Sequence, residues 1–314
     1  MKNLLLLSVF LLSGVLAFAQ PRELTEEELD DRFNFYVVND LGRNGYYDQK
    51  PIAERMGEME EVVGFEFVAA LGDVHHFEGV ASVNDPLWMT NYELVYSHPE
   101  LMVDWFPILG NHEYRGNTQA VLDYGKVSRR WCMQGRYYTQ EYEVENGVTL
   151  RLLYIDTAPL IDKYREESDE YPDVCKQDMQ RQLDWIDSVL TVNKATWTVV
   201  MGHHPMYAQT SKDECEREDL QKRLNPILKK HGVDMYIAGH IHNYQHIRVK
   251  DSDIDYIVNT SASLSRDVEP VEGTVFCSSA TGFSVCSASA TDLKFYMLDK
   301  DGNVLHVVER KLKK

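Results

Sequence analysis

The sequence predicts an α/β fold of four layers, in which two β-sheets pack face to face and helices cover their outer sides. Apolar strand-like runs alternate with amphipathic segments through the first half of the chain, and the last third is mainly β-forming. No internal repeat and no Pro- or Ser-rich linker divides the chain. We therefore expect one domain over residues 33–314, whose β-rich end supplies the second sheet.

The first half alternates short strands with helices. Three apolar runs rich in aromatic and β-branched residues predict buried strands, at Phe33–Asn39, Phe65–Leu71 and Trp105–Leu109. Between them, Pro51–Val63 repeats apolar residues at helical spacing, and Pro86–Ser97 is also predicted to be helical.

A hairpin and a second alternating series follow. Two strand-like runs, 137–144 and 149–155, flank Asn146-Gly147, which is a strong hairpin-turn signal. The later predicted elements are a helix at Gln177–Val192, a strand at Trp197–Met201, a helix at Asp219–His231 that Gly232 ends, and a strand at Met235–Ala238.

The first 19 residues have the features of a secretory signal peptide. A basic start at Lys2 precedes an apolar run over 4–18, and Ala17-Phe18-Ala19 is a cleavage pattern. A transmembrane anchor is the alternative, but it needs about 18 or more apolar residues, and serines and a glycine break this run. We expect an exported protein, periplasmic or extracellular, that stays out of the membrane and whose residues 20–32 form an acidic, solvated lead-in.

The formal net charge of −18 excludes one class of partner. A nucleic-acid backbone attracts basic surfaces, so no nucleic-acid-binding surface is expected. An acidic protein can still act on phosphates where bound metal ions reverse the local sign of charge. We expect the protein to be a monomer.

The five cysteines form an odd set without a Cys-x-x-Cys pair, so they do not indicate a zinc or redox motif. Export permits disulfides. Cys277 and Cys286 lie close together in a β-forming segment, where a disulfide would clip a hairpin. Cys175 and Cys215 would bridge two surface loops, which leaves Cys132 free.

Almost every predicted strand ends on residues that bind metal ions. The segments are Asn39-Asp40-Leu41-Gly42, Gly72-Asp73-Val74-His75-His76, Gly110-Asn111-His112-Glu113, Gly202-His203-His204-Pro205 and Gly239-His240-Ile241-His242. Each motif alone is more often a turn or a surface accident. Open α/β sheets bind ligands outside the carboxyl ends of their strands, so five such motifs in this position are expected to converge on one site.

The residue types of these segments suit a pair of metal ions. Two ions about 3.5–4 Å apart need a bridging carboxylate together with carboxylate, imidazole and amide ligands. Asp73 is the natural bridge. The alternation of His240 and His242 sends both imidazoles to the same side of an extended segment, so that one could serve each ion.

The order of the motifs resembles that of the purple acid phosphatases, within the calcineurin-like metallophosphoesterases. The family pattern is Asp-x-Gly, Gly-Asp-x-x-Tyr, Gly-Asn-His-(Asp/Glu), Gly-His-x-Pro and Gly-His-x-His. The small tartrate-resistant branch is the most similar, because Gly110–Asn117, Tyr124–Trp131 and Gly239–Asn243 resemble it beyond the ligands. The resemblance covers about residues 34–243 and is weaker over the C-terminal third. It implies a single-domain metallophosphoesterase sandwich and a metal-dependent phosphoric ester hydrolase.

The resemblance also implies one ligand set for each ion. The first ion would take Asp40, Asp73, His76 and His242, and the second would take Asp73, Asn111, His203 and His240. The implied catalytic residues are Asp73 and His112. His112 would contact the phosphate and protonate the leaving oxygen, and Glu113 would orient the His112 ring. The implied reaction is hydrolysis of a small phosphate monoester by in-line attack of a metal-bound hydroxide.

His76 departs from the family, which has a tyrosine three positions after the bridging aspartate. The tyrosinate gives these enzymes their iron(III) bond and purple colour. Neutral imidazole stabilises a trivalent ion less and suits Fe(II), Zn or Mn better. The hypothesis is therefore two ions of the Fe, Zn or Mn class, with iron(III) disfavoured. His75 is an alternative ligand with the wrong spacing.

The substrate-binding residues are a second point of departure. The predicted substrate contacts are Asn117, Arg115, His204 and Asn243, and Arg43 is a further candidate. A surface role is as compatible with Arg43, Arg115 and Asn243. The family carries another histidine in the loop after Pro205, and residues 206–214 contain none. Either His204 or Lys212 substitutes for it, or His112 alone supplies the acid.

Three other functions compete with a phosphomonoesterase. A phosphodiesterase or a nucleotidase of the same superfamily is the nearest alternative. A Ser/Thr protein phosphatase is disfavoured because Leu41-Gly42 follows Asp40 where those enzymes carry Asp-x-His, and His75–Phe77 stands where they use arginines. A non-catalytic metal-binding protein would require a defective site, and all seven ligand positions hold competent residues.

Overall fold

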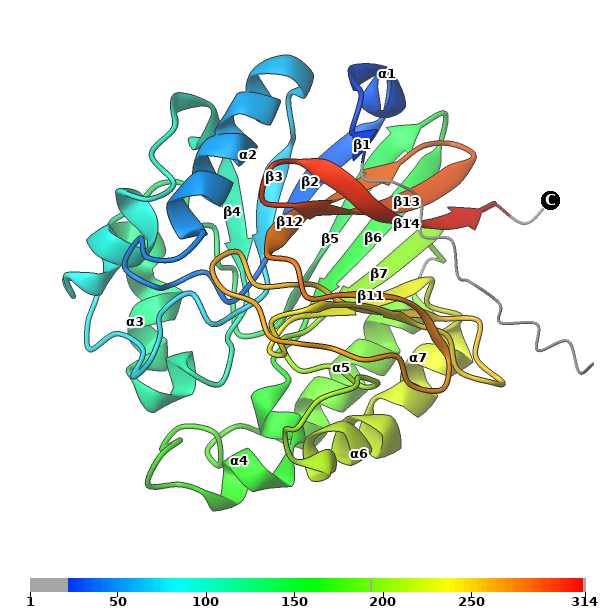
Figure 1. Cartoon of the computed structure of the whole chain (residues 1–314). Coiled ribbons are helices and arrows are strands. Elements are labelled where there is room, and N and C mark those ends of the chain that lie inside the picture. The colour runs from blue at the N-terminus through cyan, green and yellow to red at the C-terminus, as the bar shows by residue number, and fades with distance from the viewer. Residues whose placement is uncertain (1–21, 193, 313–314) are drawn as a thin grey trace, which may run out of the picture.

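Two seven-stranded mixed sheets face each other, and helices cover their outer sides, in the computed structural model (Figure 1). The structure describes residues 22–192 and 194–312, so the predicted signal peptide lies outside the described residues. No helix in the described ranges is long and apolar enough to cross a membrane. The predicted four-layer α/β fold is confirmed.

The first sheet has the order β1-β14-β13-β12-β2-β3-β4. Its strands are β1 (Arg22–Glu23), β14 (Asn303–Lys311), β13 (Asp292–Asp299), β12 (Gly282–Ala288), β2 (Phe33–Val38), β3 (Phe67–Ala70) and β4 (Asp104–Pro107). Strands β2, β3 and β4 are parallel, and the remaining pairs are antiparallel.

The second sheet has the order β11-β9-β10-β8-β7-β6-β5. Its strands are β11 (Thr274–Ser278), β9 (Tyr244–Ile247), β10 (Asp255–Val258), β8 (Met235–Ala238), β7 (Trp197–Met201), β6 (Val148–Tyr154) and β5 (Tyr138–Glu145). Strands β10, β8, β7 and β6 are parallel to one another, and the other three strands are antiparallel additions.

The β-rich end does not form a sheet of its own, so that part of the prediction is wrong. Strands β12 to β14 extend the first sheet from β2, whereas β9 to β11 extend the second sheet from β8. Strand β12 pairs with β2 in a register that buries alternate residues of both strands together. Cys286 and Ala288 of β12 lie in the same buried cluster as Phe35 and Val37 of β2. Periodicity identifies strands, but the choice of partner depends on long-range packing.

The core between the sheets follows the two-residue period of the strands. In β2, Phe35 and Val37 face the second sheet, while Tyr36 and Val38 belong to the outer core under the helices. The Tyr36 hydroxyl donates to Met56 O at 2.9 Å and so joins β2 to its covering helix. A strand buried on both faces explains why residues 35–38 of this run are all apolar.

The helices divide between the two outer faces (Figure 1). They are α1 (Glu26–Leu29), α2 (Gln49–Val63), α3 (Thr118–Asp123), α4 (Asp162–Glu166), α5 (Met179–Thr191), α6 (Glu214–Arg223) and α7 (Asn225–His231), with short 3₁₀ turns at Pro99–Leu101, Glu113–Arg115, Tyr124–Lys126 and Ala158–Leu160. In the view of Figure 1, α2 and α3 lie beside the first sheet, and α5, α6 and α7 lie together beside the second.

Two predicted helices differ in the structure. The helix expected at Asp219–His231 is two helices, α6 and α7, because Pro226 at the start of α7 cannot donate a hydrogen bond to the preceding turn. Gly232 ends α7 in a left-handed conformation, as predicted. The segment 86–97 is helical only over 87–93, as two α-helical residues followed by a π-helical turn at Met89–Glu93.

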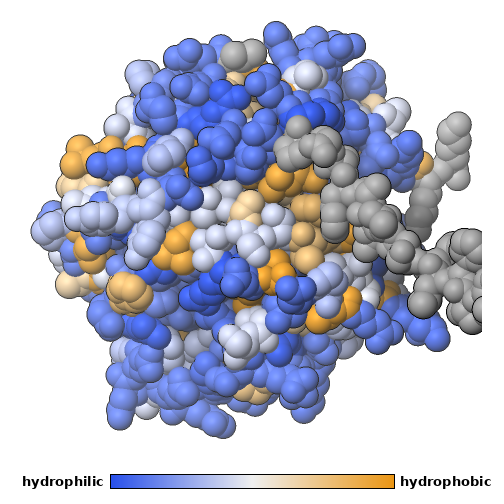
Figure 2. Space-filling model, viewed as in Figure 1, coloured by the Kyte–Doolittle hydropathy of each residue, from blue (hydrophilic) through white to orange (hydrophobic). Residues whose placement is uncertain are grey.

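The acidic segment after residue 21 packs partly onto the domain. Strand β1 pairs with β14 at the edge of the first sheet, and Leu29 at the end of α1 is buried. Glu26 and Glu27 remain exposed. Figure 2, drawn in the same view as Figure 1, shows mostly hydrophilic residues with hydrophobic patches across the middle of the molecule.

The cysteines form no disulfide in the described part of the chain, so the two predicted bridges are corrected. Cys277 lies on β11 and Cys286 on β12, which belong to different sheets rather than to one hairpin. Cys286 is buried in the core between the sheets, where burial raises the pKa of its thiol. Cys175 and Cys215 are separate, exposed thiols.

Candidate metal centre

The predicted ligands follow the parallel strands of both sheets and meet at one edge. Asp40 follows β2, Asp73 follows β3, Asn111 follows β4, His203 follows β7 and His240 follows β8. The carboxyl ends of parallel strands share an edge, so two facing sheets bring all five segments together.

The backbone at these turns is unusual. Asp40, Asp73, His240 and His242 have φ between 52° and 70°, a left-handed conformation that non-glycine residues rarely adopt. Gly110 is required beside them, because a Cβ there would overlap Asp73 Oδ1. Strain of this kind persists where surrounding structure enforces it, and it concentrates at functional sites.

Asp73 lies at the centre of the group. Its Oδ2 is 3.2 Å from His203 Nε2, 3.5 Å from His76 Nε2 and 3.8 Å from His112 Nε2. Burial opposes a charge on Asp73, but these histidines outweigh burial and hold the pKa of its carboxyl well below the usual range. The position is that of a carboxylate shared between two ions.

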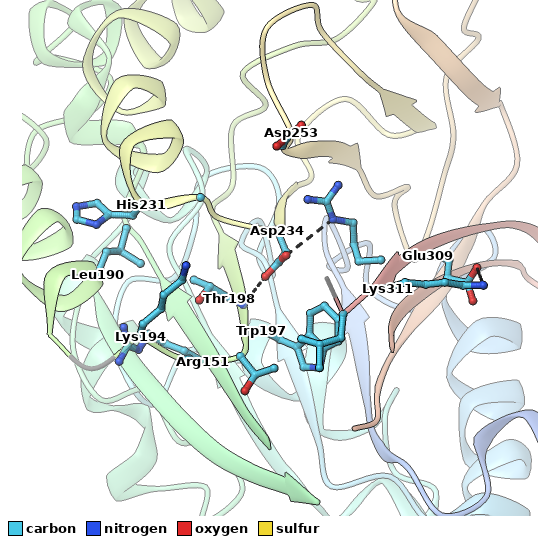
Figure 3. A pocket seen from close by; sticks show the side chains of 15 residues that line it. Arg151, Leu190, Lys194, Trp197, Thr198, His231, Asp234, Asp253, Glu309 and Lys311 are labelled. Atoms are coloured by element: carbon cyan, nitrogen blue, oxygen red, sulfur yellow. Dashed lines mark hydrogen bonds and ion pairs between the residues drawn. The ribbon is translucent and has the colours of Figure 1, made fainter. Parts of the chain in front are cut away.

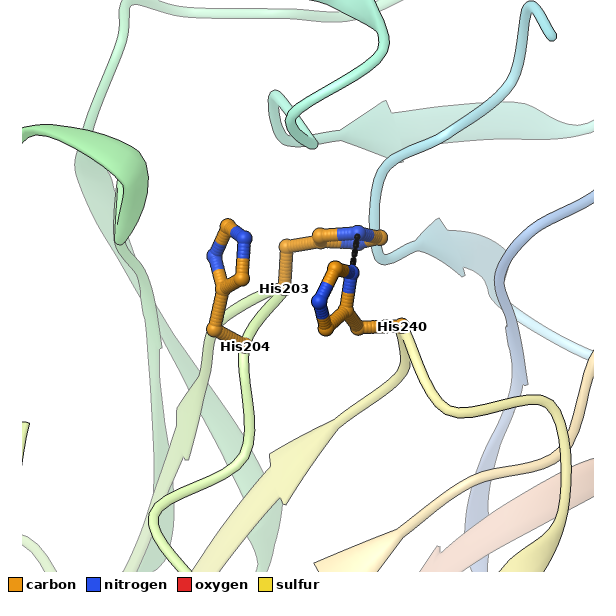
Figure 4. A group of neighbouring side chains, drawn as sticks. All are labelled: His203, His204 and His240. Carbon is orange, nitrogen blue, oxygen red and sulfur yellow. Dashed lines mark hydrogen bonds between the residues drawn. The ribbon is translucent and has the colours of Figure 1, made fainter. Parts of the chain in front are cut away.

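The remaining ligands form two groups around Asp73. Asp40, His76 and His242 offer donor atoms within 4.8 Å of one another, with Asp40 Oδ1 at 3.0 Å from His242 Nε2. On the other side, His240 Nδ1 lies 3.2 Å from His203 Nε2 (Figure 4). Each of these two groups consists of residues that the resemblance assigns to one ion.

The donor atoms fit metal ions better than they fit one another. Asn111 Oδ1, His242 Nδ1, His204 Nε2 and both ring nitrogens of His76 are buried and have no hydrogen-bond partner in the described ranges. A buried polar atom without a partner costs about 1–3 kcal/mol. Carboxylate, amide and imidazole donors of this number suit two ions of the Fe, Zn or Mn class.

Electrostatics favour binding of cations with release of a proton. Burial lowers the pKa of His203, but the charge and hydrogen bond of Asp73 raise it to about 9 overall. His203 Nδ1 is 2.8 Å from Leu71 O, which leaves Nε2 to face Asp73. A metal ion would displace the proton on that nitrogen.

The structure brings His76, and not His75, to the ligand group. His75 is fully buried, where its ring packs edge-on against Trp88 at 4.3 Å between centroids. Its Nδ1 lies 3.3 Å from Asn91 Nδ2, and burial lowers its pKa to about 3. His75 is therefore a buried neutral side chain outside the ligand group.

His112 and Glu113 have separate tasks. His112 Nδ1 is 2.6 Å from Phe77 O, so this nitrogen carries the proton and Nε2 faces Asp73. The Glu113 carboxylate accepts backbone N–H groups from Asp73 at 2.8 Å, His75 at 3.1 Å and Gly110 at 2.7 Å. The expectation that Glu113 orients the His112 ring is corrected: it joins the two ligand loops through their backbone.

Of the expected substrate contacts, only His204 joins the ligand group. Its ring is buried beside His203 and His240 (Figure 4), and its Nδ1 lies 2.8 Å from Thr157 Oγ1.

The other three expected contacts make hydrogen bonds of their own. Asn117 caps α3 by accepting from Ala120 N, and Arg115 pairs with Glu170 at 2.6 Å. The side-chain amide of Asn243 makes two hydrogen bonds: its Nδ2 donates to Asp267 O at 3.3 Å, and its Oδ1 accepts from Gln245 Nε2 at 2.8 Å.

Sequence reasoning missed Glu216 and Thr157. Glu216 Oε2 lies 3.1 Å from His240 Nε2, and Thr157 Oγ1 accepts from His203 N at 3.3 Å and His204 N at 3.1 Å. Helix α6 is charged on all sides, so nothing in its pattern singles out Glu216. Thr157 does have a signal, because it follows the carboxyl end of β6 just as the candidate ligands follow other strands.

Glu216 is predicted to tune the metal affinity of His240. A carboxylate that accepts from a ligand histidine fixes its ring, and loss of such a partner costs about 10–100-fold in metal affinity. Glu216→Gln should lower the affinity for the second ion by that factor, measured by competition with a chromophoric chelator. Glu218→Gln, an exposed change on the same helix, is the matched control. Unchanged affinity in Glu216→Gln would contradict this role.

Asp156 predicts a pH dependence of stability. It follows β6, is buried, and accepts from the Tyr114 hydroxyl; burial raises its pKa to about 7. The folded state thus holds a proton that the unfolded state releases above about pH 4, so this group lowers the free energy of unfolding as pH rises from 4 to 7, by on the order of 1 kcal/mol per unit.

Asp156→Asn should remove this pH-dependent decrease. The free energy of unfolding of the variant, relative to that of the unchanged protein, should therefore rise between pH 5 and pH 7. Urea unfolding of metal-free protein at several pH values measures it, with exposed Asp169→Asn as the control. A difference that stays constant with pH would refute the assignment.

One cavity of about 570 Å³ lies away from the ligands (Figure 3). Trp197 and Asp234, at the amino ends of β7 and β8, line it together with Arg151 and Arg310. No predicted site residue lines it. A second cavity, of about 400 Å³, is lined by His76 and therefore adjoins the metal centre.

Comparisons with known proteins agree with this geometry. Residues 33–244 match the calcineurin-like phosphoesterase family. Purple acid phosphatase 3 of Arabidopsis thaliana is 31% identical over 300 residues, which cover 91% of this chain and 79% of that protein. Tartrate-resistant acid phosphatase type 5 of Oryctolagus cuniculus is 30% identical over 213 residues, which cover 66% of this chain and 64% of that protein.

Solved structures show the same fold. GAP50, described as the anchor in the inner membrane complex of Plasmodium, superimposes with a TM-score of 0.77 at 25% identity and covers 90% of both chains. Purple acid phosphatase PPD1 of yellow lupin (Lupinus luteus) has a TM-score of 0.63 at 16% identity over 88% of this chain and 53% of that chain. The chain belongs to the calcineurin-like phosphoesterase family of metal-dependent phosphoric ester hydrolases, with purple and tartrate-resistant acid phosphatases among its relatives.

Proposed function

We propose that the protein is an exported two-metal phosphatase that hydrolyses small phosphate monoesters by in-line displacement at phosphorus. One observation carries the proposal: Asp73 and five other predicted ligands form overlapping groups of donor atoms, and several buried donor atoms of the predicted ligands, including Asn111 Oδ1, have no hydrogen-bond partner among the described residues. The names of its relatives, which are acid phosphatases, support the monoester as the substrate class.

The chain's own residues hold and protonate the substrate. Bound ions would supply charge neutralisation on the phosphate and activation of water. His112, fixed through Nδ1 by Phe77 O, keeps Nε2 on the side of Asp73. When the ring is doubly protonated, Nε2 would give its proton to the leaving oxygen; burial lowers the pKa of His112, so this form is populated at acid pH.

Lys212 is the better substitute for the histidine that the family carries after Pro205. Its Nζ lies 3.5 Å from His240 Nδ1, so an ammonium group faces the ligands. His204 is fully buried, and burial with the neighbouring His240 and His203 holds its pKa well below the usual range. Burial lowers the pKa of Lys212 as well, and in its protonated form this side chain would supply positive charge where a phosphate would bind.

A non-catalytic role is the second candidate function. GAP50, which shares the fold at a TM-score of 0.77, is described as an anchor in a membrane complex. The complete set of ligand residues and the position of His112 favour an enzyme over an anchor.

Hydrolysis of matched chromogenic substrates tests the proposal. 4-Nitrophenyl phosphate should be cleaved faster than bis(4-nitrophenyl) phosphate by protein supplied with zinc, manganese or iron(II), and a chelator should remove the activity. Faster cleavage of the diester would reassign the protein as a phosphodiesterase. Failure to cleave either substrate with metals in excess would favour the non-catalytic role.

His76 predicts a colourless enzyme. Protein loaded with iron should show no strong visible charge-transfer band, because no tyrosine occupies the position of the family's tyrosinate. His76→Tyr should gain that band, whereas Phe77→Tyr, one residue along on an exposed ring, should not. Visible absorption spectra of the three proteins measure this. A strong band in the unchanged protein would contradict the assignment of His76 as the ligand.

A further inference from the structure

The cavity beside the metal centre is lined largely by aromatic rings. Its volume is about 400 Å³. The residues that line it are Gly42, Arg43, Asn44, Tyr46, Tyr47, His76 and Phe77. His76 belongs to the ligand group, and Gly42 follows Asp40 by two positions, so whatever fills this aromatic pocket lies next to the reacting phosphate.

The rings of the aromatic pocket are exposed to an unusual degree. Tyr46 is 72% exposed, Tyr47 69% and Phe77 63%, the three highest values for large hydrophobic side chains among the described residues. Single exposed apolar residues are ordinary, but several gathered at one cavity mark a binding surface. Solvent exposure of three rings at one place indicates that a ligand covers them.

The loop that carries Tyr46 and Tyr47 is held by hydrogen bonds to two buried side chains. Gly45 N donates to Gln49 Oε1 at 2.8 Å and Asn44 N donates to Asn91 Oδ1 at 2.7 Å, and both acceptor side chains are fully buried. Tyr47 has a φ of 57°, which aromatic residues rarely adopt. The rings are thus held outward by structure, which lowers the ordering cost of binding.

Arg43 and Phe77 connect the pocket to the catalytic histidine. The Arg43 guanidinium lies 4.8 Å from the centroid of the Phe77 ring, and its Nε is buried without a hydrogen-bond partner in the described ranges. The carbonyl of Phe77 is 2.6 Å from His112 Nδ1. A group that packs against Phe77 therefore lies beside the histidine that protonates the leaving oxygen.

We propose that the aromatic pocket binds the leaving group of the substrate, and that this leaving group carries a planar aromatic ring. An aryl alcohol and a nucleoside share that chemistry. The inference rests on the proposed phosphomonoesterase function. Flat rings stack on tyrosine, phenylalanine and arginine, whereas saturated groups of the same size gain only surface burial.

Two matched substrate pairs test the preference and separate its two sources. Benzyl and cyclohexylmethyl phosphate both release a primary alkoxide and differ in the flatness of the ring. Adenosine 5′-monophosphate and ribose 5-phosphate release the same 5′ oxygen and differ in the base. The aromatic member of at least one pair should have a kcat/KM about tenfold higher. The pair that shows the larger ratio identifies the source, and ratios near one in both pairs overturn the proposal.

Variants show whether the preference comes from this pocket. Tyr46→Ala and Phe77→Ala should each lower the ratio of kcat/KM between the aromatic and the non-aromatic substrate toward one, and Tyr46→Phe should retain that ratio. Leu94→Ala removes a side chain that is 62% exposed outside the pocket and serves as the control. A ratio that persists in the Tyr46→Ala, Phe77→Ala double variant would refute the assignment.

Binding without turnover separates this inference from the proposed function. Calorimetric titration of metal-loaded protein with benzylphosphonate and cyclohexylmethylphosphonate compares affinities for compounds that cannot be hydrolysed. Tighter binding of benzylphosphonate, lost in Phe77→Ala, supports the pocket even if no monoester is cleaved. Equal binding of the two phosphonates would overturn the pocket while leaving the phosphatase activity intact.

Discussion

Asp73→Asn should abolish most turnover of phosphate monoesters, lowering kcat by on the order of 10³-fold, because bound ions supply several kcal/mol of charge stabilisation. Among the described residues, Asp73 is the one carboxylate within 3.8 Å of His203, His76 and His112. Asparagine keeps the shape of the side chain but removes the charge that two ions share. The variant should therefore hold fewer than two ions per chain by elemental analysis.

Exposed Asp104→Asn, at the start of β4, is the control for the loss of one negative charge. It should keep two ions and full activity. Circular dichroism should show that Asp73→Asn is folded, so that its lost activity reports the site. An Asp73→Asn variant with normal kcat and two bound ions would remove Asp73 from the bridging position.

Of the variants proposed, Glu113→Ala should destabilise the protein most, lowering the free energy of unfolding by on the order of 3–6 kcal/mol. Its carboxylate accepts three buried backbone N–H groups, from Asp73, His75 and Gly110. Each N–H left without an acceptor costs about 1–3 kcal/mol. Urea unfolding of metal-free protein measures the loss.

Glu113→Gln should be less damaging, because its amide oxygen still accepts from some of these donors. Glu78→Ala, at an exposed position of the same region, is the control and should stay within about 0.5 kcal/mol of the unchanged protein. Since Glu113 holds the loops of Asp73 and Gly110 together, Glu113→Ala should also weaken metal binding. A stability near that of the control would show that the loops do not depend on this carboxylate.

The candidate ligands could be picked out from the sequence because their signals are local. Glycine before Asp73 or His240 marks a tight turn, and a metal-binding residue after an apolar run marks a strand end. The structure brings the donor atoms of Asp40, Asp73, His76, His203, His240 and His242 together in overlapping groups, and it separates His75 from them by packing its ring against Trp88. The strands and the layer order followed from the same periodicities.

Other features depend on contacts between distant segments. Nothing in the sequence near Cys277 and Cys286 reveals that their strands enter different sheets. The carboxylate of Glu216 on α6 lies 3.1 Å from the ring of His240, which is 24 residues away in the sequence, so only the fold brings the two together. Exposure of Tyr46 and Tyr47 likewise depends on the buried amides below their loop, which no local pattern announces.

Titration of metal-free protein with one metal ion at a time tests the two-metal account most directly. Rates of 4-nitrophenyl phosphate hydrolysis should be zero without metal and should rise until two equivalents of zinc, manganese or iron(II) are bound per chain. Asp73→Asn should show no such rise. A plateau at one equivalent, or full activity in metal-free protein, would contradict the account.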